Sequence, residues 1–166
     1  MKKILTLFAV VGLFAFSSCS NDDVDNDTIS EVFERTVTFS AANNYSALIS
    51  LNPAIFTSDM VLVYRLTGFD NGQDVWKLVP ETYYFPDGTL SFGYEYDFTI
   101  NDVSINMFGY DLATVPGGNK VNQIFRVVIV PGYVSTNKSV NKTDYSDYYA
   151  VIKKYNLDDT NIKRSK

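Results

Sequence analysis

One stretch of strictly alternating residues constrains the fold more than any other part of the chain. From position 92 to position 100, every even position carries a large apolar or aromatic side chain, and every odd position carries a small, hydroxylated or acidic one. The even positions are Phe92, Tyr94, Tyr96, Phe98 and Ile100. Because successive side chains of a β-strand point to opposite faces, this pattern predicts a strand with one buried face and one hydrated face.

The same period of two recurs along most of the chain. It predicts further strands near residues 33–39, 45–51, 75–79, 82–85 and 103–107. The strands are separated by turn signals, which include Gly68, Asp70-Asn71-Gly72 and Pro86-Asp87-Gly88. About eight strands at this spacing predict an all-β fold, an antiparallel two-sheet β-sandwich that is immunoglobulin-like or fibronectin-like in style.

Two almost continuous apolar runs, 60–66 and 124–130, are typical of strands that are covered on both faces or lie at the centre of a sheet. Arg126 lies inside the second run. Because a lone buried charge is costly, we expect its guanidinium to reach either solvent or a carboxylate.

Only the C-terminal part changes period. Its tyrosines and isoleucine recur at helical spacing, which predicts one amphipathic α-helix over residues 144–156, packed against the sheet and capped by Thr143 or Asp144. A last strand is the alternative, since residues 148–152 are also good β-sequence. We expect the domain to span residues 31–158 and the basic segment 159–166 to be a frayed tail.

The N-terminal segment has the features of a cleaved secretory signal. Lys2 and Lys3 precede an apolar run over residues 4–16, and small residues then lead to Cys19. The run is shorter than the roughly 20 residues that a membrane-spanning helix needs. We therefore expect residues 1–18 to be removed rather than kept as an anchor.

The end of this segment, Phe16-Ser17-Ser18-Cys19, resembles the lipobox of bacterial lipoproteins, with Phe16 where that family most often has Leu. The resemblance implies that Cys19 is acylated on its sulfur, freed by cleavage on its N-terminal side and acylated again on the new amine. An ordinary secreted protein with a stray thiol is the alternative, but one unpaired cysteine is unusual in an exported chain. Multiple acylation would exceed the two signals that stable anchoring requires.

The residues that follow carry a second resemblance. Ser20-Asn21-Asp22-Asp23 is similar to the acidic export signal of surface lipoproteins in Bacteroidota, and Asp is absent directly after Cys19. The resemblance implies an outer-membrane lipoprotein that faces the cell exterior; a plain acidic tether over residues 19–30 is the alternative. Asp27-Thr28-Ile29 matches the pattern that Bacteroidota O-glycosylate, which makes Thr28 a candidate sugar site.

Composition narrows the possible functions. Without residues 1–18 the chain keeps 12 basic and 19 acidic residues, a net charge of −7, which argues against nucleic acid as a partner. There is no histidine, and the single cysteine is assigned to lipid. The commonest general base, the commonest transition-metal ligand and thiol nucleophiles are thereby missing. We expect no cofactor, no metal and no enzymatic activity.

Acidic residues provide two alternatives to that expectation. Glu95 and Asp97 share one strand face. Glu95, paired with Asp97 or with Glu81, could serve a small carbohydrate-active enzyme, although such acids are also typical of any hydrated strand face. Residues 70–74 supply oxygen ligands in a turn, but they lack the order of a calcium loop, and a hairpin explains them without an ion.

Aromatic residues are the remaining candidates for a site. The chain has 12 Tyr, 12 Phe and 1 Trp. Such rings can stack on sugars when they are exposed, and pack the core when they are not. The candidate ligand contacts are Trp76, Tyr83, Tyr84, Tyr110 and Tyr133. We therefore expect a membrane-anchored, non-enzymatic binding or scaffolding module whose partner is a glycan or an envelope protein.

Overall fold

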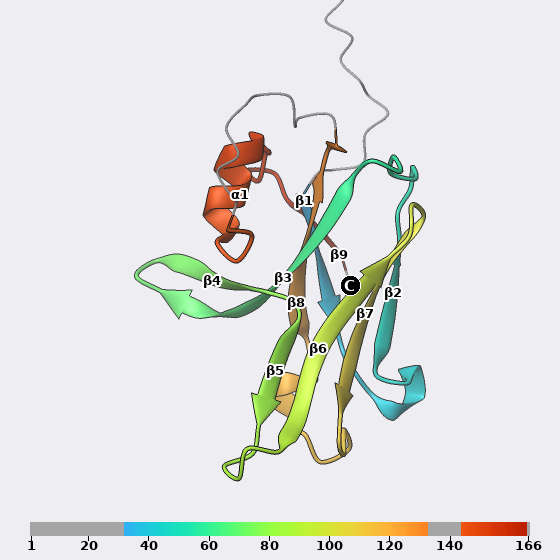
Figure 1. Ribbon diagram of the computed structural model, residues 1–166, viewed down its shortest axis with the longest axis vertical. Helices are drawn as coiled ribbons and strands as arrows, with labels where there is room; N and C mark the ends of the chain where they lie inside the picture. Colours follow the sequence, from blue (N-terminus) through green and yellow to red (C-terminus); the bar gives the residue numbers. More distant parts are fainter. Residues whose placement is uncertain (1–31, 133–143, 166) are drawn as a thin grey trace, which may run out of the picture.

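The structure, a computed structural model, describes residues 32–132 and 144–165. These residues form two β-sheets, two short 3-10 helices and one α-helix (Figure 1). The predictions for residues 1–18, Cys19, the export signal at 20–23, Thr28 and Tyr133 lie outside the described residues.

The described residues form nine strands, and most of them coincide with the runs of period two. The strands are β1 (Val32–Val37), β2 (Ser46–Ser50), β3 (Met60–Asp70), β4 (Gln73–Leu78), β5 (Glu81–Tyr84), β6 (Leu90–Phe98), β7 (Asp102–Gly109), β8 (Gln123–Val130) and β9 (Lys163–Ser165). The helices are η1 (Ala41–Asn43), η2 (Gly117–Asn119) and α1 (Tyr148–Tyr155).

The strands make a five-stranded sheet in the order β4-β3-β8-β1-β9 and a four-stranded sheet in the order β2-β7-β6-β5. Neighbouring strands run antiparallel except β1 and β9, which are parallel. The predicted all-β class is therefore confirmed at this level: the fold is mostly β, with two mainly antiparallel sheets and one helix, as in a β-sandwich.

Apolar side chains fill the space between the two sheets. Phe92 and Tyr94 of the alternating stretch are buried in this core, and Tyr96 is half-buried against it. Phe98 and Ile100 are each 41 % exposed. Since β6 ends at Phe98, these two residues lie at and beyond the rim of the sheet, where the alternation no longer guarantees burial.

Helix α1 covers the outer face of the five-stranded sheet, on the side away from β2 and β7 (Figure 1). Tyr148 and Val151 of the helix are buried there. The ring of Tyr148 lies 5.2 Å from the ring of Tyr64 and 5.8 Å from that of Trp76. The predicted packing of a C-terminal helix on the sheet is confirmed, and the alternative of a last strand over these residues is not.

The helix begins later than residue 144. Its N-cap is Asp147, whose carboxylate accepts a hydrogen bond from the amide of Ala150 at 3.0 Å. Asp144 instead accepts hydrogen bonds from the amide and hydroxyl of Ser146, at 3.0 and 2.6 Å. Asp144 was therefore wrongly predicted as the cap, because its carboxylate closes a local turn before the helix starts.

Part of the C-terminal segment that was expected to be frayed is ordered into β9, so that prediction was wrong. β9 pairs with β1, placing Lys163 opposite Phe33 and Arg164 opposite Glu34. Arg164 Nε donates to Glu34 Oε2 at 2.8 Å. The two residues are 130 positions apart, and a pairing at that separation leaves no local pattern in the sequence.

Of the two turn predictions near the β3–β4 hairpin, one is confirmed and one was wrong. Asn71 and Gly72 have φ angles of 48° and 87° and form the two-residue connection, which confirms the hairpin interpretation of residues 70–74. Gly68 was wrongly predicted as a turn residue. It lies inside β3, where the pairing with β4 shifts register between Leu66 and Gly68.

Candidate functional site

The structure separates the aromatic residues that were proposed to contact a ligand. Trp76 is only 8 % exposed and lies beneath helix α1. The guanidinium carbon of Arg126 is 3.9 Å from the centre of its ring. Trp76 was therefore wrongly assigned to a binding surface. Its ring packs between α1 and the outer face of the five-stranded sheet, and the guanidinium of Arg126 lies over the ring.

Tyr83 is half-buried, with its ring packed against the core between the two sheets. Its ring stacks on Phe92 at 4.6 Å, with an angle of 13° between the planes. Its hydroxyl donates to Glu81 Oε2 at 2.7 Å and accepts a hydrogen bond from Arg65 Nη2 at 2.5 Å. Burial, followed by the hydrogen bond to Glu81, raises the pKa of Tyr83. The hydroxyl of Tyr83 is thus engaged within the protein, but its ring is only half-buried and borders a cleft beside Arg65, so its role as a ligand contact stays a prediction.

Two of the predicted residues, Tyr84 and Tyr110, are exposed at the end of the four-stranded sheet where β6 begins. Tyr84 is 62 % exposed and pairs across the strands with Leu90. Tyr110 is 89 % exposed and directly follows β7, and its amide donates to the carbonyl of Ser91 on β6 at 3.2 Å. The two tyrosines thus flank the start of β6.

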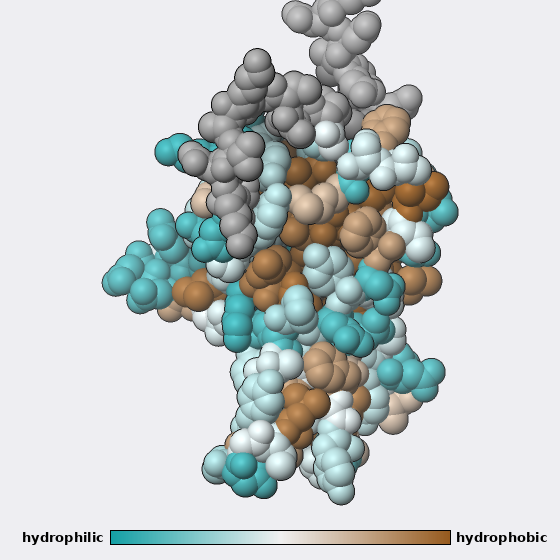
Figure 2. Space-filling model, in the orientation of Figure 1, coloured by the Kyte–Doolittle hydropathy of each residue, from teal (hydrophilic) through white to brown (hydrophobic). Residues whose placement is uncertain are grey.

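Phe108 completes this surface. It pairs with Gly93, and a Cβ built on Gly93 would lie 2.5 Å from the Phe108 ring, so the ring covers the glycine on the face opposite the core. We call Tyr84, Leu90, Phe108 and Tyr110 the tyrosine face. Figure 2 shows apolar surface over the lower parts of β5 and β6, bordered by more polar atoms.

Sequence reasoning had missed Leu90 and Phe108. Phe108 directly follows Met107 and is therefore out of phase with the core residues of β7, so the alternation already placed it on the hydrated face. Leu90 could not be assigned in this way. The pairing of β5 with β6 shifts register between Tyr83 and Tyr84, which changes which residues face outward.

The structure separates one of the three candidate catalytic acids from the other two. Glu95 and Asp97 are exposed and share the outer face of the sheet, as predicted, opposite Asn106 and Ser104. Glu81 is buried and pairs with Tyr94, whose side chain faces the core. Glu81 and Glu95 therefore lie on opposite faces of the same sheet, which removes the alternative that joined them in one site.

The carboxylate of Glu81 is occupied by Arg65, at the point where the chain crosses from one sheet to the other. Arg65 donates to both oxygens of Glu81, at 3.1 and 2.9 Å, and its Nη1 donates to Gln123 Oε1 at 3.2 Å. Burial alone would lower the pKa of Arg65, but the hydrogen bond and the charge of Glu81 outweigh it, so this pKa is raised. A cleft of about 360 Å³ borders the group. Because the charges of Arg65 and Glu81 already pair with each other, we interpret this cluster as structural.

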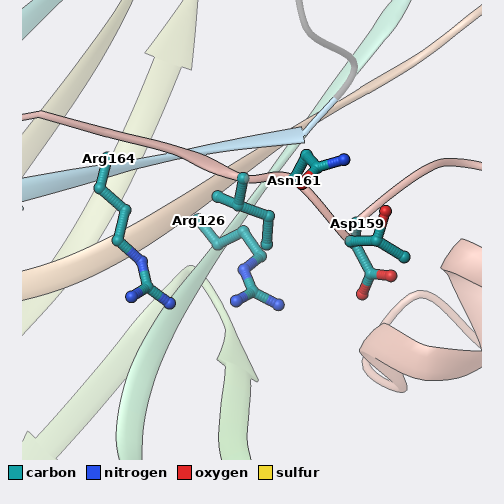
Figure 3. A pocket seen from close by; sticks show the side chains of 6 residues that line it. Arg126, Asp159, Asn161 and Arg164 are labelled. Carbon is teal, nitrogen blue, oxygen red and sulfur yellow. The ribbon is translucent and has the colours of Figure 1, made fainter.

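A second cleft, of about 510 Å³, opens between β9 and the segment that precedes it. Figure 3 shows two arginines side by side along this cleft and an aspartate at its other end. We call it the Arg164 cleft. It is lined by Arg126, Asp159, Thr160, Asn161, Ile162 and Arg164.

Arg126 meets a carboxylate, as the sequence predicted. Its Nε and Nη2 atoms donate to Glu34 Oε1 at 3.1 and 2.5 Å.

No group of three or more His, Cys, Asp or Glu that could hold a metal occurs in residues 32–132 and 144–165. Within the same residues no helix is long and apolar enough to cross a membrane.

No protein-family model, curated protein or solved structure matches this chain.

Replacing Arg65 by Met should lower the free energy of unfolding by about 3–5 kcal/mol, because it leaves the buried carboxylate of Glu81 without its main partner. Urea unfolding of the purified protein measures this. Lys77→Met is the matched control: its exposed ammonium lies 3.5 Å from the same carboxylate, and its loss should cost about 0–1 kcal/mol. Equal effects of the two substitutions would contradict a structural role for the buried pair.

Proposed function

We propose that this chain is an outer-membrane lipoprotein, anchored through acylated Cys19 and facing the cell exterior, whose domain is a non-enzymatic binding module. We further propose that the β-sandwich is immunoglobulin-like and that the tyrosine face is its binding surface, with a glycan as ligand. The observation that carries the choice of surface is the outward placement of Tyr84 and Tyr110, at 62 % and 89 % exposure, at the same end of the four-stranded sheet.

The anchor rests on the sequence. Phe16-Ser17-Ser18-Cys19 supplies the lipobox resemblance, and twelve residues, 20–31, lie between Cys19 and the start of β1. A chain of that length spans at most about 45 Å in any conformation. The domain would thus stay within that distance of the membrane surface and would meet ligands that are themselves part of the envelope or brought to it.

The choice of a glycan follows from the kind of side chains on the face. An exposed tyrosine presents an apolar ring together with a hydroxyl that stays hydrated, which suits a ligand that is itself partly apolar and partly hydroxylated. Neighbouring strands are about 4.8 Å apart, so Tyr84 and Tyr110, on either side of β6, are separated by about 10 Å. An oligosaccharide rather than a single sugar would contact both rings.

An envelope protein bound to the same face is the second candidate. The exposed Leu90 and the half-buried Phe108 beside the tyrosines favour it, because larger apolar patches mark protein contacts as well as ligand sites. A small carbohydrate-active enzyme is the third, and only the shared face of Glu95 and Asp97 favours it. Hydrolytic activity that is lost in Glu95→Gln, with the fold intact, would establish the enzyme instead.

Replacing Cys19 by Ser should abolish incorporation of radiolabelled palmitate and release the protein from the envelope fraction, because the oxygen of serine is not a substrate for the lipid transfer that the lipobox implies. Labelled cells that carry either form, fractionated in parallel, measure both effects. Palmitate-free wild-type protein, or a serine variant that still fractionates with envelopes, would contradict the anchor.

Tyr84→Ala and Tyr110→Ala should each weaken glycan binding by at least about tenfold, the effect expected of a central aromatic contact. Affinity electrophoresis through gels that contain soluble bacterial polysaccharides measures the retardation. Tyr149→Ala is the control, since Tyr149 is 48 % exposed but lies on α1, away from this face. If all three variants are retarded as strongly as the wild type, the tyrosine face is excluded as the binding surface. If no polysaccharide retards the wild type, glycan binding is excluded.

A further inference from the structure

The Arg164 cleft has a surplus of positive charge at one end. Arg126 and Arg164 both bind the carboxylate of Glu34, one on each oxygen. Two guanidinium groups therefore share one carboxylate, and one positive charge is left over. Glu34 and Arg126 are buried, whereas Arg164, the solvent-facing member of the group, is screened by water.

The two arginines differ in what they can still bind. Arg126 packs against the adjoining rings of Trp76 and Tyr148, with its guanidinium carbon 3.9 and 4.8 Å from their centres, so its position is fixed. Arg164 uses only Nε on Glu34, and its side chain is 74 % exposed. Its two terminal nitrogens have no hydrogen-bond partner within the described part of the chain, and they form the planar fork that recognises carboxylates.

The other end of the cleft carries the opposite charge. Asp159 Oδ2 accepts a hydrogen bond from the Tyr148 hydroxyl at 2.8 Å, which holds the carboxylate in place. Within the described residues, Asp159 Oδ1 has no partner. Asn161 lies between Arg126 and Asp159 in Figure 3, and Thr160 also lines the cleft.

We propose that the Arg164 cleft binds a free α-amino acid. The terminal nitrogens of Arg164 donate to the ligand's carboxylate, and Asp159 Oδ1 accepts from its ammonium group. The volume of about 510 Å³ leaves room for a side chain beyond these two groups. The mostly polar wall favours amino acids with polar side chains. This inference uses a different surface from the tyrosine face and does not depend on it.

A phosphate ion fits the same charges less well. The cleft has one surplus positive charge from the arginines, and Asp159 adds a negative charge at the far end. A dianion would exceed the surplus and be repelled by Asp159, whereas a zwitterion matches both ends. A simple carboxylate such as acetate would use only one end and should bind more weakly than an amino acid.

Equilibrium dialysis of the full-length protein in detergent against an equimolar mixture of the twenty common amino acids, with each quantified by mass spectrometry, tests the proposal. We expect selective retention of at least one of them. Acetate should compete only at a concentration at least about tenfold higher than the retained amino acid, as one ionic contact is missing. Retention of none of the twenty would overturn the proposal.

Substitutions at each end of the cleft test the contribution of that end on its own. Arg164→Gln and Asp159→Asn should each reduce retention at least about tenfold, while Lys163→Gln, which removes the neighbouring charge on β9 outside the cleft, should leave it unchanged. Unchanged retention in Asp159→Asn, or displacement by inorganic phosphate as effective as by the amino acid itself, would show an anion site and overturn the zwitterion.

Arg164 also pairs β9 with β1, so loss of binding could reflect loss of the strand. Amide hydrogen exchange at residues 163–165 reports whether β9 is still paired. If Arg164→Gln frees the strand, Arg164→Lys serves in its place, because it keeps a positive charge beside Glu34 but lacks the fork. With β9 paired, Arg164→Lys should still bind at least about fivefold more weakly; binding equal to the wild type would contradict the role of the guanidinium.

Discussion

The buried ion pair between Arg65 and Glu81 is the contact on which the arrangement of the two sheets depends. β4 ends at Leu78 in the five-stranded sheet and β5 begins at Glu81 in the four-stranded one, so the pair lies where the chain changes sheets. Both charges lose their hydration there. The hydrogen bonds that Tyr83 donates to Glu81 and that Arg65 donates to Glu81 and Gln123 offset this cost. The sequence has a single cysteine, at position 19, so no disulfide within residues 32–165 shares this task.

Because the ion pair holds β5 in place, it also determines which side chains of β5 face solvent. Tyr83 is drawn inward by Glu81 and Arg65, and the residue after it therefore points outward. The shift in register beside it brings Leu90 next to Tyr84, and Gly93 leaves room for the ring of Phe108. The proposed binding surface is thus a consequence of the same contact that joins the sheets.

Much of the fold could be predicted from the alternation of residues, but the sites could not. The strand at 92–98, the covered strands and the C-terminal helix follow from periods of two and 3.6, which are local. Trp76 was misassigned because Arg126, from β8, lies over its ring. Tyr83 is half-buried because its hydroxyl bonds to Glu81 on its own strand and to Arg65 on β3. The Arg164 cleft depends on a pairing between residues 130 positions apart. Such contacts are fixed by the packing of whole layers, and no window of sequence contains them.

Amide hydrogen exchange of the protein in native outer-membrane vesicles, compared with the purified protein in detergent, tests most directly whether the tyrosine face is the surface that the anchored domain uses. The account predicts added protection in vesicles at residues 82–84, 90–93 and 107–110, with little change in α1. Protection that appears on α1 instead, or that is the same in both preparations, would contradict it.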